Sequence, residues 1–151
     1  MIKEAILTYL SRKKLENVAF FDKWSKTYDN FIFSGWMRHL YDKAVKEVPP
    51  YFSGKILDVG CATGNLLARL RRKIAGPLFG VDISVEMIKK ARAKLSGLQK
   101  IKVALADADS LPFKNESFDY VVSTLMWHHL LSPLRAINEI RRVLRKGGKF
   151  V

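Results

Sequence analysis

One stretch, residues 55–66, constrains the fold of this chain more than any other; it reads Lys-Ile-Leu-Asp-Val-Gly-Cys-Ala-Thr-Gly-Asn-Leu. The apolar run at 56–59 is typical of a fully buried parallel strand, and the leucines at 66–70 recur at the spacing of a buried helix face. Between them, Gly60 and Gly64 allow a sharp turn that leaves amide groups open at a helix N-terminus. The stretch therefore predicts a strand, a tight turn and a helix, with a ligand at the turn.

The next strand narrows the class of ligand. An apolar run at 78–81 ends in Asp82, which lies 24 positions after Asp58, where a βαβ unit places an acid against ribose hydroxyls. A dinucleotide site, however, requires the spacing G-x-G-x-x-G, and this turn reads Asp-x-Gly-x-Ala-x-Gly. The pattern favours a ligand with a ribose and fits a nicotinamide site poorly.

The remaining periodicity predicts alternating helices and strands along the chain. Apolar residues at 2, 5, 6, 9 and 10 indicate an amphipathic helix that packs on the core and ends near the Lys13-Lys14 pair. The other expected elements are an aromatic segment at 20–31, a helix at 36–48, helices starting at Asn65 and after Ser84, strands at 101–106 and 118–124, a helix from Ser132-Pro133 closed by Gly147-Gly148, and a strand starting at Phe150. This order predicts an α/β fold with a doubly wound, mostly parallel sheet of five strands or fewer, preceded by N-terminal helices.

Five ordered segments resemble the motifs of class I S-adenosylmethionine-dependent methyltransferases, which have a Rossmann-like fold. They are ILDVGCATGNL, VDIS, ADADSLPF, FDYVVSTLMWHHL and RVLRKGGKFV, and together they span residues 55–151. The chain is most similar to the methyltransferase type 11 group, which includes C-methyltransferases of quinone biosynthesis. The resemblance implies that S-adenosyl-L-methionine is the cofactor and that the methyl group goes to a small-molecule acceptor. It also implies a helical lid at 1–50 over a cofactor-binding core at 51–151.

The resemblance assigns roles to side chains that follow the predicted strands. Asp58 would hold the cofactor's ammonium group through water, Asp82 its ribose hydroxyls, and Asp107 with the Ala108 amide the adenine edge, while Ile83 would pack on the adenine face. The full expected set is Tyr28, Asp58, Gly60, Cys61, Ala62, Gly64, Asp82, Ile83, Asp107, Ala108 and Thr124. Tyr28 belongs to an F-D-x-x-x-x-x-Y-D segment that resembles the lid of the quinone-type enzymes, although core packing would equally explain it.

Two features depart from the family pattern. Ala62 stands where the motif usually has its middle glycine, which is tolerable at negative φ. The chain also ends where the fifth strand is expected to begin, so the sixth and seventh strands of the family fold are absent. An open sheet edge invites pairing. We therefore expect a fragment of a longer protein. The alternative is that a partner or the N-terminal helices cover the edge.

His128 and His129 are the candidate catalytic residues, because they follow the fourth predicted strand and a neutral imidazole can accept a proton near neutral pH. A base is required only if the acceptor must lose a proton, and either histidine could instead shape the pocket. The one other histidine is His39, and adjacent histidines do not chelate as i, i+4 pairs do, so no metal site is expected.

The charge leaves a second function open. The chain has 27 basic and 14 acidic residues, a net charge of +13, which suits a polyanion such as RNA. The basic runs lack interleaved aromatic residues, which favours an ordinary solvated surface over a nucleic-acid face. An RNA- or tRNA-modifying methyltransferase is thus one alternative, and a non-catalytic nucleotide-binding module or a dehydrogenase-like domain is another.

Localisation and further contacts are weakly constrained. A single cysteine, Cys61, excludes an internal disulfide and agrees with a reducing compartment. The sequence contains no membrane-spanning run and no signal peptide, which indicates a cytoplasmic protein. Peripheral contact of the basic N-terminal helix with an anionic membrane is an open alternative, and the sequence specifies no oligomeric state.

Overall fold

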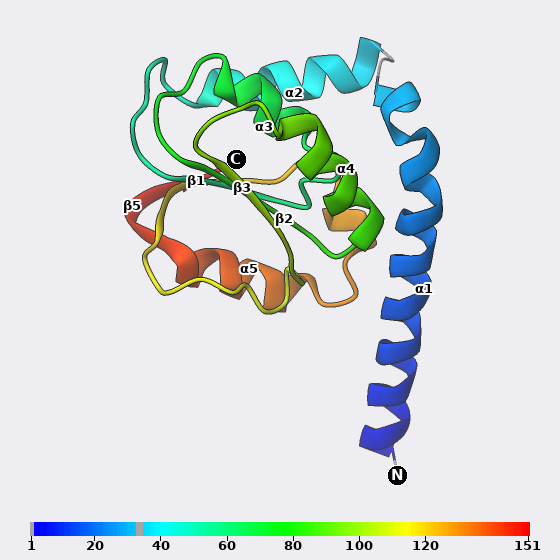
Figure 1. Ribbon diagram of the computed structural model, residues 1–151. Helices are drawn as coiled ribbons and strands as arrows, with labels where there is room; N and C mark the ends of the chain where they lie inside the picture. Colours follow the sequence, from blue (N-terminus) through cyan, green and yellow to red (C-terminus); the bar gives the residue numbers. More distant parts are fainter. Residues whose placement is uncertain (1, 33–34) are drawn as a thin grey trace.

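A five-stranded parallel sheet forms the centre of the computed structural model, which describes residues 2–32 and 35–151 (Figure 1). Its strands are β1 (Ile56–Val59), β2 (Leu78–Asp82), β3 (Ile101–Leu105), β4 (Phe118–Val122) and β5 (Leu144–Phe150), in the order β3-β2-β1-β4-β5. The chain winds outward from β1 in one direction and then from β4 in the other. A crevice therefore opens at the carboxyl ends of β1 and β4, where sheets of this kind bind ligands. The predicted Rossmann-like fold is confirmed.

Helices cover both faces of the sheet. One face carries α2 (Gly35–Glu47), α3 (Asn65–Arg71) and α4 (Val85–Leu95), and the other carries α5 (Pro133–Val143) after the short 3-10 helix η1 (Trp127–His129) (Figure 1). Successive residues of β1 serve the two layers: the side chain of Ile56 packs in the cluster with α3 and α4, and that of Leu57 packs in the cluster with α5. This explains why β1 is buried at every position, as its apolar residues Ile56, Leu57 and Val59 predict.

Helix α1 (Ile2–Ile32) corrects the prediction for the N-terminus. We expected a helix ending near Lys13-Lys14, but a single helix continues through the aromatic segment. The reason is that the first 34 residues contain neither proline nor glycine, so nothing in the sequence interrupts the helix. Its first turns extend beyond the body of the molecule (Figure 1), and Tyr9 is 59% exposed, so the expected packing of this end on the core was also wrong.

The last two elements also differ from the prediction. Ser132 precedes α5 but its side chain makes no capping hydrogen bond, and Pro133 alone fits the expected helix start. The helix ends at Val143 rather than at the two glycines, which lie within β5. Gly147 has a φ of 76°, and the pairing of β5 with β4 shifts register between Phe118 and Tyr120. The glycines thus serve an irregular strand and not a helix terminus. None of the described helices is long and apolar enough to cross a membrane.

Candidate cofactor-binding site

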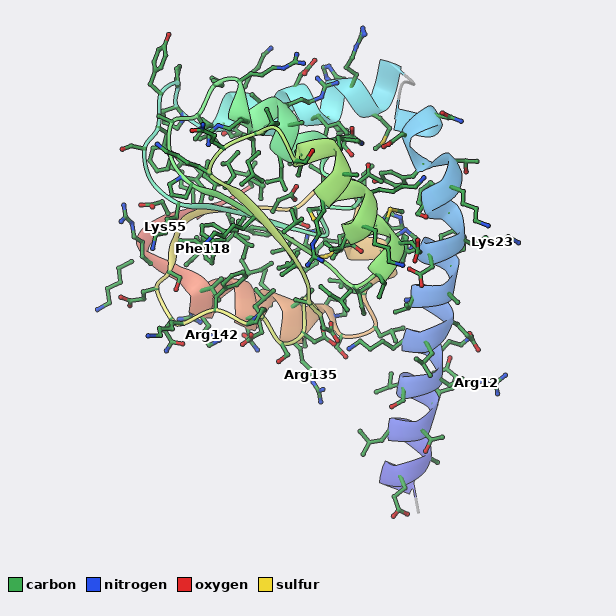
Figure 2. All side chains as sticks on the ribbon, in the orientation of Figure 1. Arg12, Lys23, Lys55, Phe118, Arg135 and Arg142 are labelled. Carbon is green, nitrogen blue, oxygen red and sulfur yellow. The ribbon has the colours of Figure 1, made fainter. Side chains whose placement is uncertain are left out.

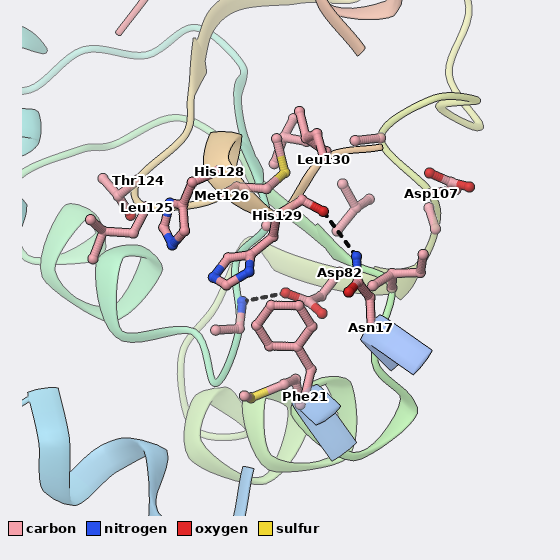
Figure 3. Close-up of a pocket in the computed structure, with 18 of the residues that line it drawn as sticks. Asn17, Phe21, Asp82, Asp107, Thr124, Leu125, Met126, His128, His129 and Leu130 are labelled. Carbon is pink, nitrogen blue, oxygen red and sulfur yellow. Dashed lines mark hydrogen bonds between the residues drawn. The ribbon is translucent and has the colours of Figure 1, made fainter. Parts of the chain in front are cut away.

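A pocket of about 290 Å³ lies between α1 and the carboxyl ends of β1, β2 and β4 (Figure 3). Ten of the predicted site residues line it, namely Tyr28, Gly60, Ala62, Asp82, Ile83, Asp107, Ala108, Thr124, His128 and His129. The other three lie behind its wall: Asp58 is buried at the end of β1, Cys61 is buried, and Gly64 begins α3. The topology therefore brings residues from five separate segments together, as the sequence predicts.

The turn after β1 is closed rather than open. The amides of Gly60 and Cys61 both donate to the carbonyl of Val81, at 2.8 and 2.9 Å, and the amide of Ala62 donates to the carboxylate of Asp82 at 2.9 Å. The prediction of amides left open for a ligand was therefore wrong for these three residues. Because β2 takes these donors, the turn forms a fixed floor, and a ligand would meet its surface and the nearby acids.

Three residues that line the pocket have a left-handed backbone conformation. Gly60 has a φ of 79°, and a Cβ there would come to 3.0 Å from the Met126 side chain, so any other residue would be strained and crowded at this position. Ala62 and Leu125, which also line the pocket, have φ values of 46° and 59°. The condition under which alanine is easily tolerated here, a negative φ, is therefore not met. The left-handed region costs a residue with a Cβ roughly 1 kcal/mol, and such strain clusters at functional sites.

Asp82 connects the turn to α4. Its Oδ2 accepts the hydrogen bond from the Ala62 amide, and its Oδ1 accepts one from the Ser84 amide, each at 2.9 Å. Burial raises the pKa of Asp82, although its backbone hydrogen bonds act in the opposite direction. Each carboxylate oxygen has a second lone pair, and Asp82 lines the pocket (Figure 3), so it can also accept bonds from a diol. The predicted cap of α4 is confirmed, because the Ser84 hydroxyl accepts from the Met87 amide at 3.1 Å.

Asp58 is the most unusual acid of the site. It is 1% exposed, and its Oδ1 accepts no hydrogen bond from any residue that the structure describes. Burial, reinforced by the neighbouring charge of Asp82, raises the pKa of Asp58 to about 8. Buried polar atoms almost always have partners. This oxygen is therefore suited to a donor or a cation brought by a ligand.

Helix α1 is held across the pocket by two acids of its aromatic segment. Asp22 accepts hydrogen bonds from the Ser84 hydroxyl at 2.5 Å and from the Glu86 amide at 3.2 Å, at the start of α4. Asp29 accepts from the Thr63 hydroxyl at 2.6 Å and from the Lys94 ammonium at 2.8 Å. These contacts anchor α1 on both sides of the turn.

The anchored helix places Tyr28 in the pocket. This side chain is 8% exposed, and its hydroxyl is hydrogen bonded with that of Tyr41 on α2. Burial is the main cause that raises the pKa of Tyr28 to about 12, so the hydroxyl is neutral across the physiological range. Tyr28 thus contributes both to the core and to the pocket wall, the two roles that the sequence left open.

The two histidines differ in their surroundings. His129 packs edge-on against the Phe21 ring at 4.8 Å, and its carbonyl accepts a hydrogen bond from the Asn17 side chain at 3.0 Å (Figure 3). Burial, and then the adjacent His128, lowers the pKa of His129, so its imidazole is neutral at pH 7. His128 is more exposed, with its ring 3.9 Å from that of His129. In the described part of the chain no group of three potential ligands could hold a metal ion.

The sequence did not predict that the middle of α1 lines the pocket. Lys14, Asn17 and Phe21 line the pocket from α1. The signal for them existed, because residues 17, 21, 24 and 28 recur at helical spacing. They were missed because the helix was expected to end near Lys14.

Comparisons with known proteins agree with this geometry. The protein family described as "Methyltransferase domain" matches residues 57–151. An uncharacterised protein of Methanocaldococcus jannaschii is 34% identical over 95% of this chain and 53% of its own length. The demethylmenaquinone methyltransferase of Clavibacter sepedonicus is 32% identical over 94% of this chain and 59% of its own length. The chain thus spans little more than half the length of these two relatives.

A solved structure supports the same assignment. It is the Haloferax volcanii complex between the Trm112 methyltransferase activator and a provisionally assigned methyltransferase; the match has a TM-score of 0.76 at 30% identity and covers 86% of this chain and 57% of that one. The family match covers well over half of the 151 residues, and the fold and the strand-end acids agree with it. The chain belongs to the class I S-adenosylmethionine-dependent methyltransferases.

Proposed function

We propose that the pocket binds S-adenosyl-L-methionine and that the protein transfers its methyl group to a small-molecule acceptor. The observation that carries the proposal is Asp58, whose fully buried carboxylate has an oxygen without a partner among the described residues. An amino acid ammonium group is a cation of the right kind to pair with this oxygen, directly or through a water molecule. The donor set thus fits the cofactor.

The other strand-end groups match the rest of the cofactor. In this proposal, Asp82 accepts from the ribose hydroxyls, Asp107 and the Ala108 amide bind the adenine edge, and Ile83 packs on the base. Tyr28, held by the lid at 1–50, covers the methionine end. Bound S-adenosylmethionine supplies a methyl group already activated by a sulfonium. The residues of the chain therefore orient the acceptor and exclude water, which together can lower a barrier by several kcal/mol.

The walls of the pocket favour a small acceptor with apolar character. Phe21, Trp24, Met126, Leu130 and Leu131 all line it, and α1 lies across it. Such walls suit an aromatic or aliphatic molecule better than a nucleotide of a folded RNA. The demethylmenaquinone methyltransferase among the relatives is consistent with this class.

The net positive charge is the observation that favours the alternative, a methyltransferase acting on RNA. Arg12, Lys23 and Arg135 project away from the body at separate places (Figure 2). Basic side chains that project into solvent in this way are typical of a solvated surface. Binding to tRNA that persists at about 50 mM salt and weakens steeply as salt rises would favour the alternative.

Titration of the chain with S-adenosylhomocysteine tests cofactor binding, with NADH titrated in parallel. We expect a dissociation constant on the order of micromolar for S-adenosylhomocysteine, about −8 kcal/mol, and no measurable binding of NADH. The reason is that the acids fit an ammonium and a ribose, whereas the amides of Gly60, Cys61 and Ala62 already donate to β2 and are not open to a pyrophosphate. Equal binding of both ligands, or binding of NADH alone, would contradict the proposal.

Replacing each histidine by asparagine tests a base at the mouth of the pocket. Because His129 is held neutral, we expect His129→Asn to lower methyl transfer by about 10²-fold if the acceptor must lose a proton. His128→Asn is the matched variant, because His128 is adjacent to His129 but more exposed. It should lower the rate of methyl transfer less. The readout is single-turnover transfer of a labelled methyl group to quinol-type and other phenolic acceptors. Unchanged rates in both variants would exclude a histidine base.

A further inference from the structure

Lys14 lies where the adenine end of the cofactor is expected. Its ammonium group forms an ion pair with Asp107 and a second, at 3.4 Å, with Asp109. Lys14 belongs to α1, whereas both acids follow β3, so these pairs join the helix to the far end of the pocket. Burial alone would lower the pKa of Lys14, but the two carboxylates outweigh it and raise the pKa, so the side chain is charged.

The two acids are not equivalent. Asp107 is the more exposed, at 30%, and its Oδ1 already accepts the Asp109 amide at 3.0 Å. The Asp109 side chain is 13% exposed, and its Oδ1 is buried without a hydrogen-bond partner among the described residues. Asp109 therefore has an unused acceptor next to an ammonium group that is 3.4 Å from its other oxygen.

An adenine amino group and the Lys14 ammonium group are both donors, and both require the Asp107 carboxylate. We propose that Lys14 is a positioning residue that moves from Asp107 to Asp109 when the adenine amino group binds Asp107. This inference rests on the proposed function, which assigns Asp107 to adenine. Asp109 keeps the ammonium group paired during the exchange, because a partly buried charge without a partner is costly. Helix α1 can then stay on the pocket while the base binds.

The exchange predicts opposite effects for the two partners of the second ion pair. Lys14→Met removes the competitor for Asp107, so we expect S-adenosylhomocysteine to bind about threefold tighter and with less salt dependence, the range typical of a partly exposed ion pair. Asp109→Asn removes the carboxylate to which Lys14 would move, so S-adenosylhomocysteine should bind about threefold more weakly. In the double variant, Asp109→Asn should not change the affinity further, because there is no Lys14 ammonium group for Asp109 to pair with.

An inosine analogue separates this exchange from a general change in how α1 docks. In S-inosylhomocysteine a carbonyl replaces the amino group, so the 6-position no longer donates to Asp107 but can accept from Lys14. The ratio of the two affinities, adenosyl over inosyl, should therefore rise at least about threefold in Lys14→Met. A change that only loosens α1 would affect both ligands alike and leave the ratio constant.

The experiment is calorimetric titration of the wild type, Lys14→Met, Asp109→Asn and the double variant with both ligands. Lys13→Met is the matched control, since Lys13 pairs with Glu16 at 2.7 Å on the outer face of α1, and its ratio should equal that of the wild type. A wild type that binds neither ligand would overturn the proposed function and this inference with it. If the wild type binds S-adenosylhomocysteine, two results would overturn the role of Lys14 alone. One is an unchanged affinity ratio in Lys14→Met, and the other is a double variant in which the effects of the two substitutions on affinity add.

Discussion

Asp58→Asn is expected to stabilise the ligand-free chain at alkaline pH and to abolish cofactor binding. Burial first, and Asp82 second, raise the pKa of Asp58 to about 8, whereas an unfolded aspartate titrates near pH 4. Between these values the unfolded chain releases a proton that the folded chain retains. The contribution of Asp58 to stability is therefore present below about pH 4 and lost as the pH rises toward 8.

The variant removes this pH-dependent cost. At pH 8.5 we expect Asp58→Asn to raise the free energy of unfolding by on the order of 2 kcal/mol, and at pH 5 by much less. Urea unfolding at the two pH values measures it. The binding of S-adenosylhomocysteine should fall by at least about 10²-fold, since the carboxylate no longer neutralises the ammonium group. Stability and binding would thus change in opposite directions.

Asp42→Asn provides the control for this variant. Asp42 is 53% exposed and pairs with Arg69 at 2.8 Å, away from the pocket. An exposed pair contributes about 0.5 kcal/mol, so neither stability nor binding should change much. If Asp58→Asn proved less stable than the wild type at pH 8.5, or bound the ligand normally, Asp58 would not be the buried partner of the ammonium group.

Asp82→Ala is expected to remove the hydrogen bonds that hold the turn after β1 and, with them, the acceptor for the ribose hydroxyls. The change leaves the amides of Ala62 and Ser84 without their acceptor, and each unsatisfied buried donor costs about 1–3 kcal/mol. Relief of the charge repulsion with Asp58 offsets part of that loss. We expect a net loss of roughly 2 kcal/mol in unfolding free energy and of at least about 10²-fold in affinity for S-adenosylhomocysteine. Urea unfolding and calorimetry measure the two.

Asp82→Asn separates the two roles of this residue. Its amide oxygen can still accept from one backbone amide, so most of the stability should return. Binding should remain weak, because a carboxylate accepts from both ribose hydroxyls and an amide offers one acceptor. If Asp82→Ala bound the ligand as well as the wild type, the ribose assignment would be wrong, whatever the change in stability.

The parts of the fold predicted well were those in which a local pattern and its tertiary role coincide. The run before Gly60 is apolar at nearly every position because β1 is covered on both faces. Ser84 caps α4 by accepting a hydrogen bond from the amide of Met87, only three residues later. The acids at strand ends could be assigned to one pocket because parallel strands end at one edge. Such features depend on contacts close in sequence or on topology alone.

The parts predicted poorly depend on contacts between distant segments. The amides of the turn looked free because their acceptors, Val81 and Asp82, lie about twenty residues away on β2. The helix was expected to end near Lys14, because the ion pairs that this residue makes with Asp107 and Asp109, over ninety residues away, cannot be seen in the local pattern. The glycines after α5 resembled a helix terminus, whereas pairing with β4 makes them part of a strand. Local propensity cannot anticipate such tertiary pairing.

A crystal structure of the chain with S-adenosylhomocysteine would test the proposed site most directly. The prediction is an ammonium group within hydrogen-bond reach of Asp58, or one water away, with the ribose hydroxyls on Asp82 and the adenine amino group on Asp107 in place of Lys14. A ligand bound outside the pocket, or one in the pocket that leaves the Asp58 carboxylate without a partner, would contradict the assignment of this site to S-adenosylmethionine.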